Sequence, residues 1–293
     1  MIKRIIEISS SPAEISLKRG QLVLSRDGVD DMTAPIEDIG VLIISHHSVN
    51  VSSGAMNEML KNNVAVIYCD GKHMPSGLLL PFSGHSTQTQ SIAAQAAMSA
   101  PSKKRLWRSV VKAKIIAQAR VLKEAREENG SLLSWAKSVR SGDPENMEAR
   151  AARFYWPRLF GKEFRRRRDG PAPNPFLNYG YAVLRASVAR ALVGAGLHPS
   201  LGIHHSSKYD DFCLADDLME PLRPLVDRKV WKIWRDNSHE ELDKGVKQAL
   251  LGILTEALII SDKKEPFMVA LQYYAASLRR ALGSGEKLDI PEW

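Results

Sequence analysis

The chain has 293 residues, 44% hydrophobic and 25% charged, a composition typical of globular proteins and unlike that of disordered or fibrous ones. Its 41 Lys and Arg against 33 Asp and Glu leave a formal charge of +8, which favours a polyanionic partner. The two cysteines, Cys69 and Cys213, have no CxxC spacing, and no apolar stretch suits a signal peptide or a membrane span. We therefore expect a cytoplasmic protein with reduced thiols.

The first eighty residues alternate short β-branched runs with turn residues. This pattern predicts strands at 4–8, 14–18, 21–25, 41–45 and 64–68. Hairpin turns are expected at 18–21 and 26–28, and one short helix at 53–62.

The composition turns polar at 80–90, and helical periodicity follows. We place a domain boundary there, between a β-rich domain at 1–84, expected to dimerise, and a helical catalytic domain at 85–293. One long helix is expected to run from Ser102 to Lys123. Two more begin at Asp143 and Asn174, each an N-cap with Pro at the first helical position, and the second ends near Gly194.

Two further helices are expected towards the C-terminus. A capping box at 238–241 leads into a helix at 242–260, and Pro266 begins a last helix that ends at Gly283. The predicted fold class is therefore α+β, a small β-rich N-terminal domain followed by a larger all-helical C-terminal domain.

Two segments carry candidate catalytic or ligand-binding side chains. Each of these side chains also has an ordinary structural interpretation. Glu148 lies near the start of a predicted helix, where a solvated glutamate is favoured by the helix dipole. His204 and His205 lie in a loop, where ligands are often held, although such a pair more commonly packs or meets solvent. The pair at 46–47 is interpreted in that simpler way.

A third segment contains two carboxylates at i, i+3 spacing. Asp217 and Glu220 are expected to project from the same side of a helical turn, where a bound cation relieves their repulsion. Salt bridges to Arg223 or Arg153 are the alternative. Asp216 is expected to be a helix cap or a surface charge.

Glu148, His205 and Glu220 together form a mixed carboxylate and imidazole set of the kind that suits Mg²⁺ or Mn²⁺. Spacing alone does not establish such a site. The chain has no HExxH, paired CxxC, Walker-type glycine loop or GxSxG, so those chemistries lose support.

Basic residues flank these segments and are candidates for contact with DNA backbone phosphates, with a solvated charged face as the alternative. The candidates are Lys103, Lys104, Arg105, Arg153, Arg165, Arg166, Arg167 and Arg168.

Over nearly its whole length the chain resembles the integrase subunit of the CRISPR adaptation module, which inserts new spacers into the repeat array. The resemblance rests on the segments 148–156, 202–205 and 217–224, in the expected order and separation. It implies that Glu148, His205 and Glu220 are catalytic metal ligands, supported by Asp217. His205 is chosen over His204 because the histidine of the family follows a Gly-x-x pattern. The form of 217–224 resembles the type II branch.

The resemblance also implies an activity and partners. The activity is metal-dependent, with Mg²⁺ or Mn²⁺: the 3′-hydroxyl of a short DNA fragment attacks a repeat-boundary phosphodiester, and water in its place gives endonuclease cleavage. The implied partners are double-stranded DNA, a second copy in a homodimer, a small adaptor protein and the RNA-guided effector nuclease of the same locus. A stand-alone repair nuclease and a non-catalytic DNA-binding scaffold are the alternatives.

Overall fold

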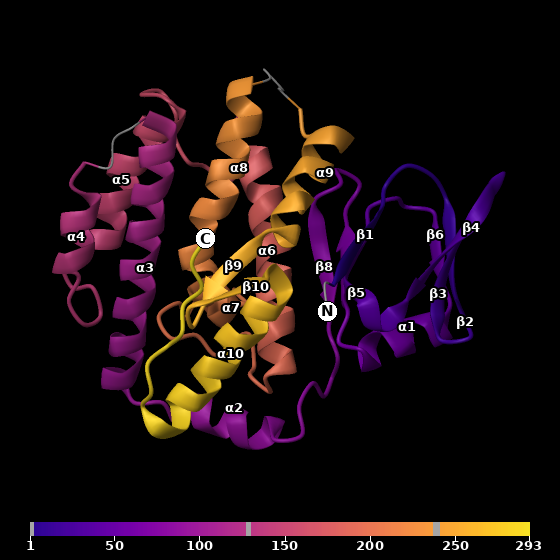
Figure 1. Ribbon diagram of the computed structural model, residues 1–293, viewed down its shortest axis with the longest axis horizontal. Helices are drawn as coiled ribbons and strands as arrows, with labels where there is room; N and C mark the ends of the chain where they lie inside the picture. The colour runs from indigo at the N-terminus through magenta and orange to yellow at the C-terminus, as the bar shows by residue number, and fades with distance from the viewer. Residues whose placement is uncertain (1–2, 127–129, 237–240) are drawn as a thin grey trace.

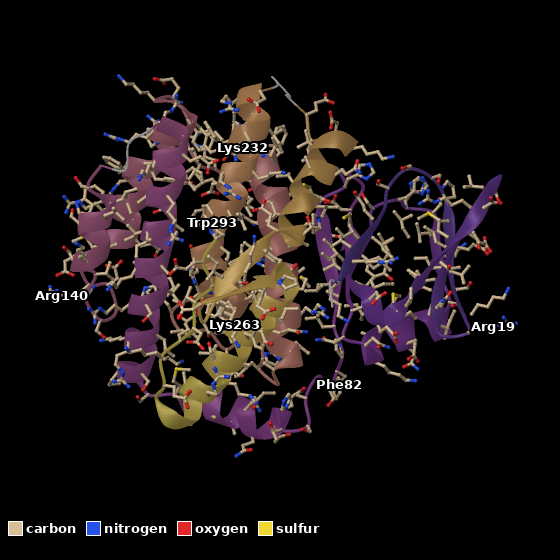
Figure 2. The ribbon with its side chains drawn as sticks, in the orientation of Figure 1. Arg19, Phe82, Arg140, Lys232, Lys263 and Trp293 are labelled. Carbon is tan, nitrogen blue, oxygen red and sulfur yellow. The ribbon has the colours of Figure 1, made fainter. Side chains whose placement is uncertain are left out.

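The computed structural model describes residues 3–126, 130–236 and 241–293, and Figure 1 shows a strand-rich part beside a larger, mostly helical part. Within these ranges, no helix is both long and apolar enough to cross a membrane. The division into domains at 1–84 and 85–293 remains a prediction. Phe82, on the segment that joins the two parts, is fully exposed (Figure 2).

The N-terminal strands form two four-stranded sheets. The first has the order β1 (Arg4–Ile8), β5 (Ile39–Ile44), β7 (Ala65–Cys69) and β8 (Pro75–Leu79), parallel except for β8. The second has the order β4 (Val29–Pro35), β3 (Gln21–Arg26), β2 (Ala13–Lys18) and β6 (Val49–Val51). The helix α1 (Ser53–Lys61) and the 3₁₀ turn η1 (Ile36–Asp38) complete this part.

The five predicted strands, both hairpin turns and the short helix are confirmed, with ends shifted by one or two residues. Gly20 and Gly28 have positive φ angles at the two turns. The strands β4, β6 and β8 were not predicted. β4 is an edge strand whose first five residues are exposed, so it lacks the apolar alternation that identifies a half-buried strand.

The centre of the first sheet is buried on both faces. All six residues of β5 are buried, which explains its unbroken apolar sequence. Because side chains alternate along a strand, Leu42 and Ile44 belong to the core beneath the second sheet and α1. Val41 and Ile43 point the other way and belong to the core of the helical part. One sheet therefore serves two cores.

The helical part is built around α6, most of whose residues are buried (Figure 1). A Cβ at Gly180 of α6 would lie 2.5 Å from Cγ1 of Val226 in α8, so this glycine permits the two helices to approach closely. The helices and 3₁₀ turns are α2 (Gln88–Ala96), α3 (Ala100–Arg126), α4 (Leu132–Ser138), α5 (Met147–Phe160), α6 (Asn174–Gly194), α7 (Cys213–Met219), η2 (Glu220–Leu222), α8 (Arg223–Asp236), α9 (Lys244–Leu251), η3 (Gly252–Thr255) and α10 (Phe267–Ser284).

Several predicted helix ends need correction. The helix predicted from Ser102 begins two residues earlier, at Ala100, and continues to Arg126. The prediction that Asp143 is an N-cap was wrong, because Asn146 occupies that position in α5. The Asp143 carboxylate instead accepts hydrogen bonds from the backbone N–H groups of Met147 (2.9 Å) and Glu148 (3.0 Å).

The prediction for Asn174 was also wrong in detail. Pro173 is the N-cap of α6, and Asn174 is its first residue. The side-chain oxygen of Asn174 accepts from the backbone N–H of Arg167 at 2.9 Å, so it anchors the preceding loop rather than the helix.

The prediction of an all-helical C-terminal domain was wrong. α9 ends at Leu251, and after η3 the strand β9 (Ala257–Ile260) pairs antiparallel with β10 (Lys263–Pro266). In β9 the buried residues alternate with exposed ones, which is the period of a strand. Residues 238–240 of the predicted capping box lie outside the described residues, and α9 is capped by Asp243, whose side chain accepts from Val246 N at 2.8 Å. The last predicted helix is confirmed as α10.

A buried carboxyl group joins three helices of this part. Asp227 in α8 accepts hydrogen bonds from the hydroxyl groups of Tyr155 in α5, at 3.0 Å, and Tyr181 in α6. Burial raises the pKa of Asp227 to about 7, although the two tyrosine hydrogen bonds act to lower it. The neutral carboxyl group is therefore the form that the core favours.

We expect Asp227→Asn to remove a pH dependence of stability. A carboxyl group whose pKa rises on folding, here from 3.8 to about 7, stabilises the protein fully below 3.8, and this contribution is lost as pH rises to about 7. Over that window the wild type should lose up to about 1.4 kcal/mol per pH unit relative to the variant. Urea unfolding of both proteins between pH 5 and pH 8 measures this, and a difference independent of pH would contradict it.

Candidate active site

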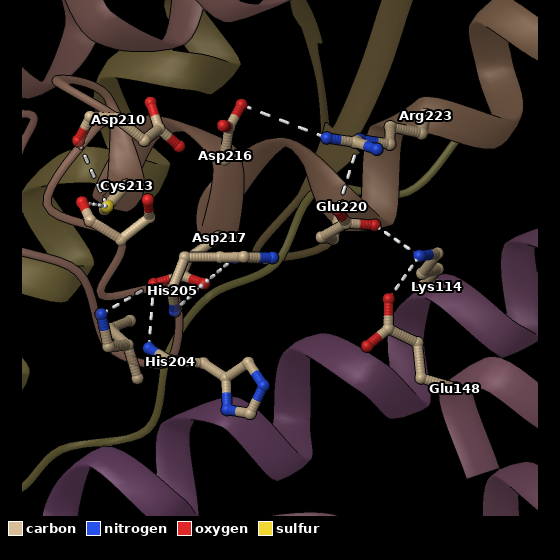
Figure 3. Close-up of polar contacts among 12 residues, drawn as sticks. Lys114, Glu148, His204, His205, Asp210, Cys213, Asp216, Asp217, Glu220 and Arg223 are labelled. Carbon is tan, nitrogen blue, oxygen red and sulfur yellow. Dashed lines mark hydrogen bonds and ion pairs between the residues drawn. The ribbon is translucent and has the colours of Figure 1, made fainter. Parts of the chain in front are cut away.

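The two predicted glutamate ligands come from different helical elements and meet beside α3. Glu148 lies in the first turn of α5 and is partly exposed, whereas Glu220 begins η2 and is buried. The Nζ atom of Lys114, from the middle of α3, lies 2.6 Å from Glu148 Oε1 and 2.5 Å from Glu220 Oε2 (Figure 3). One ammonium group thus bridges the two carboxylates.

Lys114 and the two glutamates keep one another ionised although Lys114 and Glu220 are largely buried. Burial acts to lower the pKa of Lys114, but Glu220 and Glu148 outweigh it, and the pKa lies above its ordinary value. Burial acts to raise the pKa of Glu220, but Arg223 and Lys114 outweigh it and lower the pKa. Nε of Arg223 lies 3.2 Å from Glu220 Oε1, so Glu220 is held between two cations. The salt bridge to Arg223, considered from the sequence as the alternative to a cation site, is therefore present at Glu220.

The ion pairs continue beyond Arg223. Asp216 was predicted to be a cap or a surface charge, and this was wrong: it is buried and accepts two hydrogen bonds from Arg185, at 2.7 and 2.5 Å. Arg223 Nη2 lies 3.9 Å from the same carboxylate. Acidic and basic groups therefore alternate through the site in the order Arg185, Asp216, Arg223, Glu220, Lys114 and Glu148.

Asp217 organises the histidine loop. Its fully buried carboxylate accepts hydrogen bonds from the backbone N–H groups of Ile203 (2.6 Å), His204 (2.9 Å) and His205 (3.2 Å). It also bonds Nδ1 of His205 at 2.6 Å. Asp217 and Glu220, predicted to project from the same side of a turn, engage different partners: Asp217 bonds the histidine loop, and Glu220 pairs with Lys114 and Arg223.

The hydrogen bond to Asp217 determines the pKa and the ring orientation of His205. This hydrogen bond is the main reason why the pKa of His205 lies above its ordinary value, against the opposing effect of burial. Because Nδ1 is engaged, Nε2 is the ring nitrogen left to face a ligand.

His204 has a different environment. Its ring stacks on the buried Trp107 of α3, with centroids 4.1 Å apart and planes 3° apart, while His205 meets Trp107 edge-on at 5.8 Å. Trp107 and Lys114 are seven residues apart and so lie on the same face of α3. Sequence reasoning assigned neither residue to the site, although their seven-residue spacing places both on one helix face.

The side chains at this site are of the types that bind divalent cations. Within the described part of the chain, no three His, Cys, Asp or Glu side chains converge closely enough to form a metal cluster. The space between Glu148 and Glu220 nevertheless already accommodates one positive charge at 2.5 to 2.6 Å from their oxygens. Two carboxylates with an imidazole nearby are hard to borderline ligands, the type that Mg²⁺ and Mn²⁺ accept.

The predicted DNA contacts differ in exposure. Arg153, Arg165, Arg167 and Arg168 are exposed, as are Lys104 and Arg105, whereas Lys103 is partly buried. Arg166 is turned inward: its guanidinium donates to Asn174 Oδ1 (3.1 Å) and Asn178 Oδ1 (2.7 Å) and lies over the ring of Tyr181. Arg166 therefore holds the loop together.

Comparison with known proteins identifies the family of this chain. Residues 6–257 match the family model described as CRISPR associated protein Cas1. The CRISPR-associated endonuclease Cas1 of Neisseria meningitidis is 36% identical over 284 residues, covering 95% of this chain and 93% of that protein.

Two solved structures share the fold. A casposase bound to integration product superposes with a TM-score of 0.80 at 20% identity, covering 98% of this chain and 93% of that one. A Cas6-RT-Cas1–Cas2 complex gives a TM-score of 0.74 at 17% identity, covering 98% of this chain and 36% of that one. By its family match and its relative of similar length, this chain belongs to the CRISPR-associated Cas1 family.

Proposed function

We propose that this protein is a metal-dependent DNA integrase and endonuclease that acquires spacers in CRISPR immunity. The observation that carries the proposal is the meeting of Glu148 and Glu220 around one cation, beside a histidine whose ring is oriented by Asp217. The Neisseria relative is named an endonuclease, and the casposase is bound to an integration product, which supports both activities.

In this proposal Glu148, Glu220 and Nε2 of His205 hold Mg²⁺ or Mn²⁺. A divalent ion held there would supply Lewis-acid chemistry, lowering the pKa of an attacking 3′-hydroxyl or water and offsetting charge on the phosphate oxygens. Asp217 holds the His205 ring in the orientation that presents Nε2. Arg223, behind Glu220, keeps this carboxylate ionised and fixed in position.

The partners are part of the same proposal. The substrate is double-stranded DNA, both the incoming fragment and the repeat array, bound through the exposed basic residues predicted from the sequence. A small adaptor protein is proposed on the likeness to the Cas1–Cas2 complex. A homodimer formed through the N-terminal part and the effector nuclease of the locus are further proposed partners, and the Neisseria relative is consistent with a type II system.

We expect Glu148→Gln and Glu220→Gln each to reduce strand transfer at least about 100-fold, because each removes a charged ligand without changing side-chain size. Binding of duplex DNA should be unchanged. The assay measures joining of a labelled short duplex to a supercoiled plasmid in Mn²⁺, beside a gel-shift titration. Glu58→Gln, in α1, is the matched control. Wild-type transfer by Glu148→Gln would contradict the assigned site.

Asp217→Asn should weaken Mn²⁺ binding by about 10- to 100-fold, because an amide cannot accept all the bonds that position the 203–205 backbone and His205. Mn²⁺ binding needs neutral His205, so in the wild type it should weaken as pH falls through the raised pKa of His205. In the variant this midpoint should move to lower pH.

Calorimetric titration with Mn²⁺ at several pH values measures both effects. Asp216→Asn is the matched control: it alters a neighbouring buried carboxylate whose charge raises the pKa of His205 less than Asp217 does and which hydrogen-bonds to Arg185 instead, so its midpoint should move less. An unmoved midpoint in Asp217→Asn would show that Asp217 does not position His205.

Alanine at Arg165, Arg167 and Arg168 together should weaken DNA binding and lower the slope of log affinity against log salt by up to about 3. All three residues are exposed, and the hydrogen bonds that Arg165 donates to the carbonyl oxygens of Lys162 and Phe164 lie at the surface, so the melting temperature should stay near that of the wild type. Arg166→Ala should do the reverse, lowering the melting temperature with little change in slope, since Arg166 is bonded within the loop. Equal slopes for the triple variant and the wild type would remove this loop from the DNA surface.

A further inference from the structure

Lys114 has no role in the proposed chemistry, yet it lies closest to both glutamates. Its Nζ forms charge-assisted contacts of 2.6 and 2.5 Å with Glu148 and Glu220, and only 12% of its side chain is exposed. The ammonium group therefore lies where a cation shared by these two carboxylates must lie.

An ammonium group and a metal ion cannot share this position. Mg²⁺ binds carboxylate oxygens at about 2.0 to 2.1 Å, closer than the two contacts of Lys114. An ion that draws both oxygens to that distance leaves no room for Nζ between them, and its charge repels the ammonium group. One cation must replace the other.

The residue type suits such an exchange. The other basic groups in this row of ion pairs, Arg185 and Arg223, carry planar guanidinium groups that suit fixed pairing. Lys114 carries a point charge on a flexible four-carbon stem. Glu148 is 25% exposed against 3% for Glu220, so the ammonium group has a route outward on the Glu148 side.

We propose that Lys114 is an exchangeable internal counter-ion, which holds Glu148 and Glu220 together in the metal-free protein and is displaced when a divalent cation binds. The inference rests on the metal site of the proposed function. It makes Lys114 a positioning residue whose charge prevents the two carboxylates from separating and at the same time competes with the metal.

Lys114→Met should therefore lower the melting temperature in EDTA and yet bind Mn²⁺ at least tenfold more tightly than the wild type. Lys112→Met, two residues away on the same helix, controls for the loss of one positive charge. Calorimetry and the electron paramagnetic resonance signal of free Mn²⁺ give the affinities without measuring activity. Unchanged or weaker Mn²⁺ binding by Lys114→Met would overturn the inference.

A second measurement uses the wild type alone and so does not depend on the folding of a variant. An amine-acylating reagent followed by peptide mass spectrometry should modify Lys114 several-fold faster in Mn²⁺ than in EDTA, with Lys112 as the internal reference. Mn²⁺ that binds without changing the reactivity of Lys114 would overturn this inference and leave the proposed function standing. Absence of Mn²⁺ binding by the wild type would instead overturn the metal site itself.

Discussion

Two like charges brought together in a partly buried space are the constraint on which the site depends. Glu148 and Glu220 arrive from α5 and η2, and at low dielectric their repulsion would push these elements apart. Lys114 from α3 and Arg223 from α8 supply the compensating charge. Breaking one such buried pair leaves an uncompensated charge, so the packing of these four elements and their ionisation are interdependent.

The histidine loop is ordered by a different means. It has little regular structure, so its backbone N–H groups need other partners, and the buried carboxylate of Asp217 accepts three of them. The same carboxylate orients His205, and the stacking of His204 on Trp107 fixes the loop against α3. α3 thus positions both the loop and the glutamate pair.

Sequence patterns predicted elements whose apolar residues recur with a regular period or form an unbroken run, including the largely buried β5 and α6. They failed at β9, because α9, η3 and β9 all carry apolar residues and were interpreted together as a single helix. The three candidate ligands were found because three segments matched a family in order. Lys114 was missed because its partners lie 34 and more residues away, and Asp216 because an adjacent acidic pair gives no sign that both of its members are buried.

The sheet shared by two cores limits how the molecule can be divided. Val41, Ile43, Ala65 and Ile67 face the helices, so a truncation between β8 and α2 would expose an apolar surface on each fragment. Such fragments are prone to aggregate or to bind another chain through the exposed apolar surface. The same constraint applies when two relatives exchange their N-terminal parts by recombination. The β5 of the incoming part must pack against the helices of the recipient protein on one face and against its own second sheet on the other.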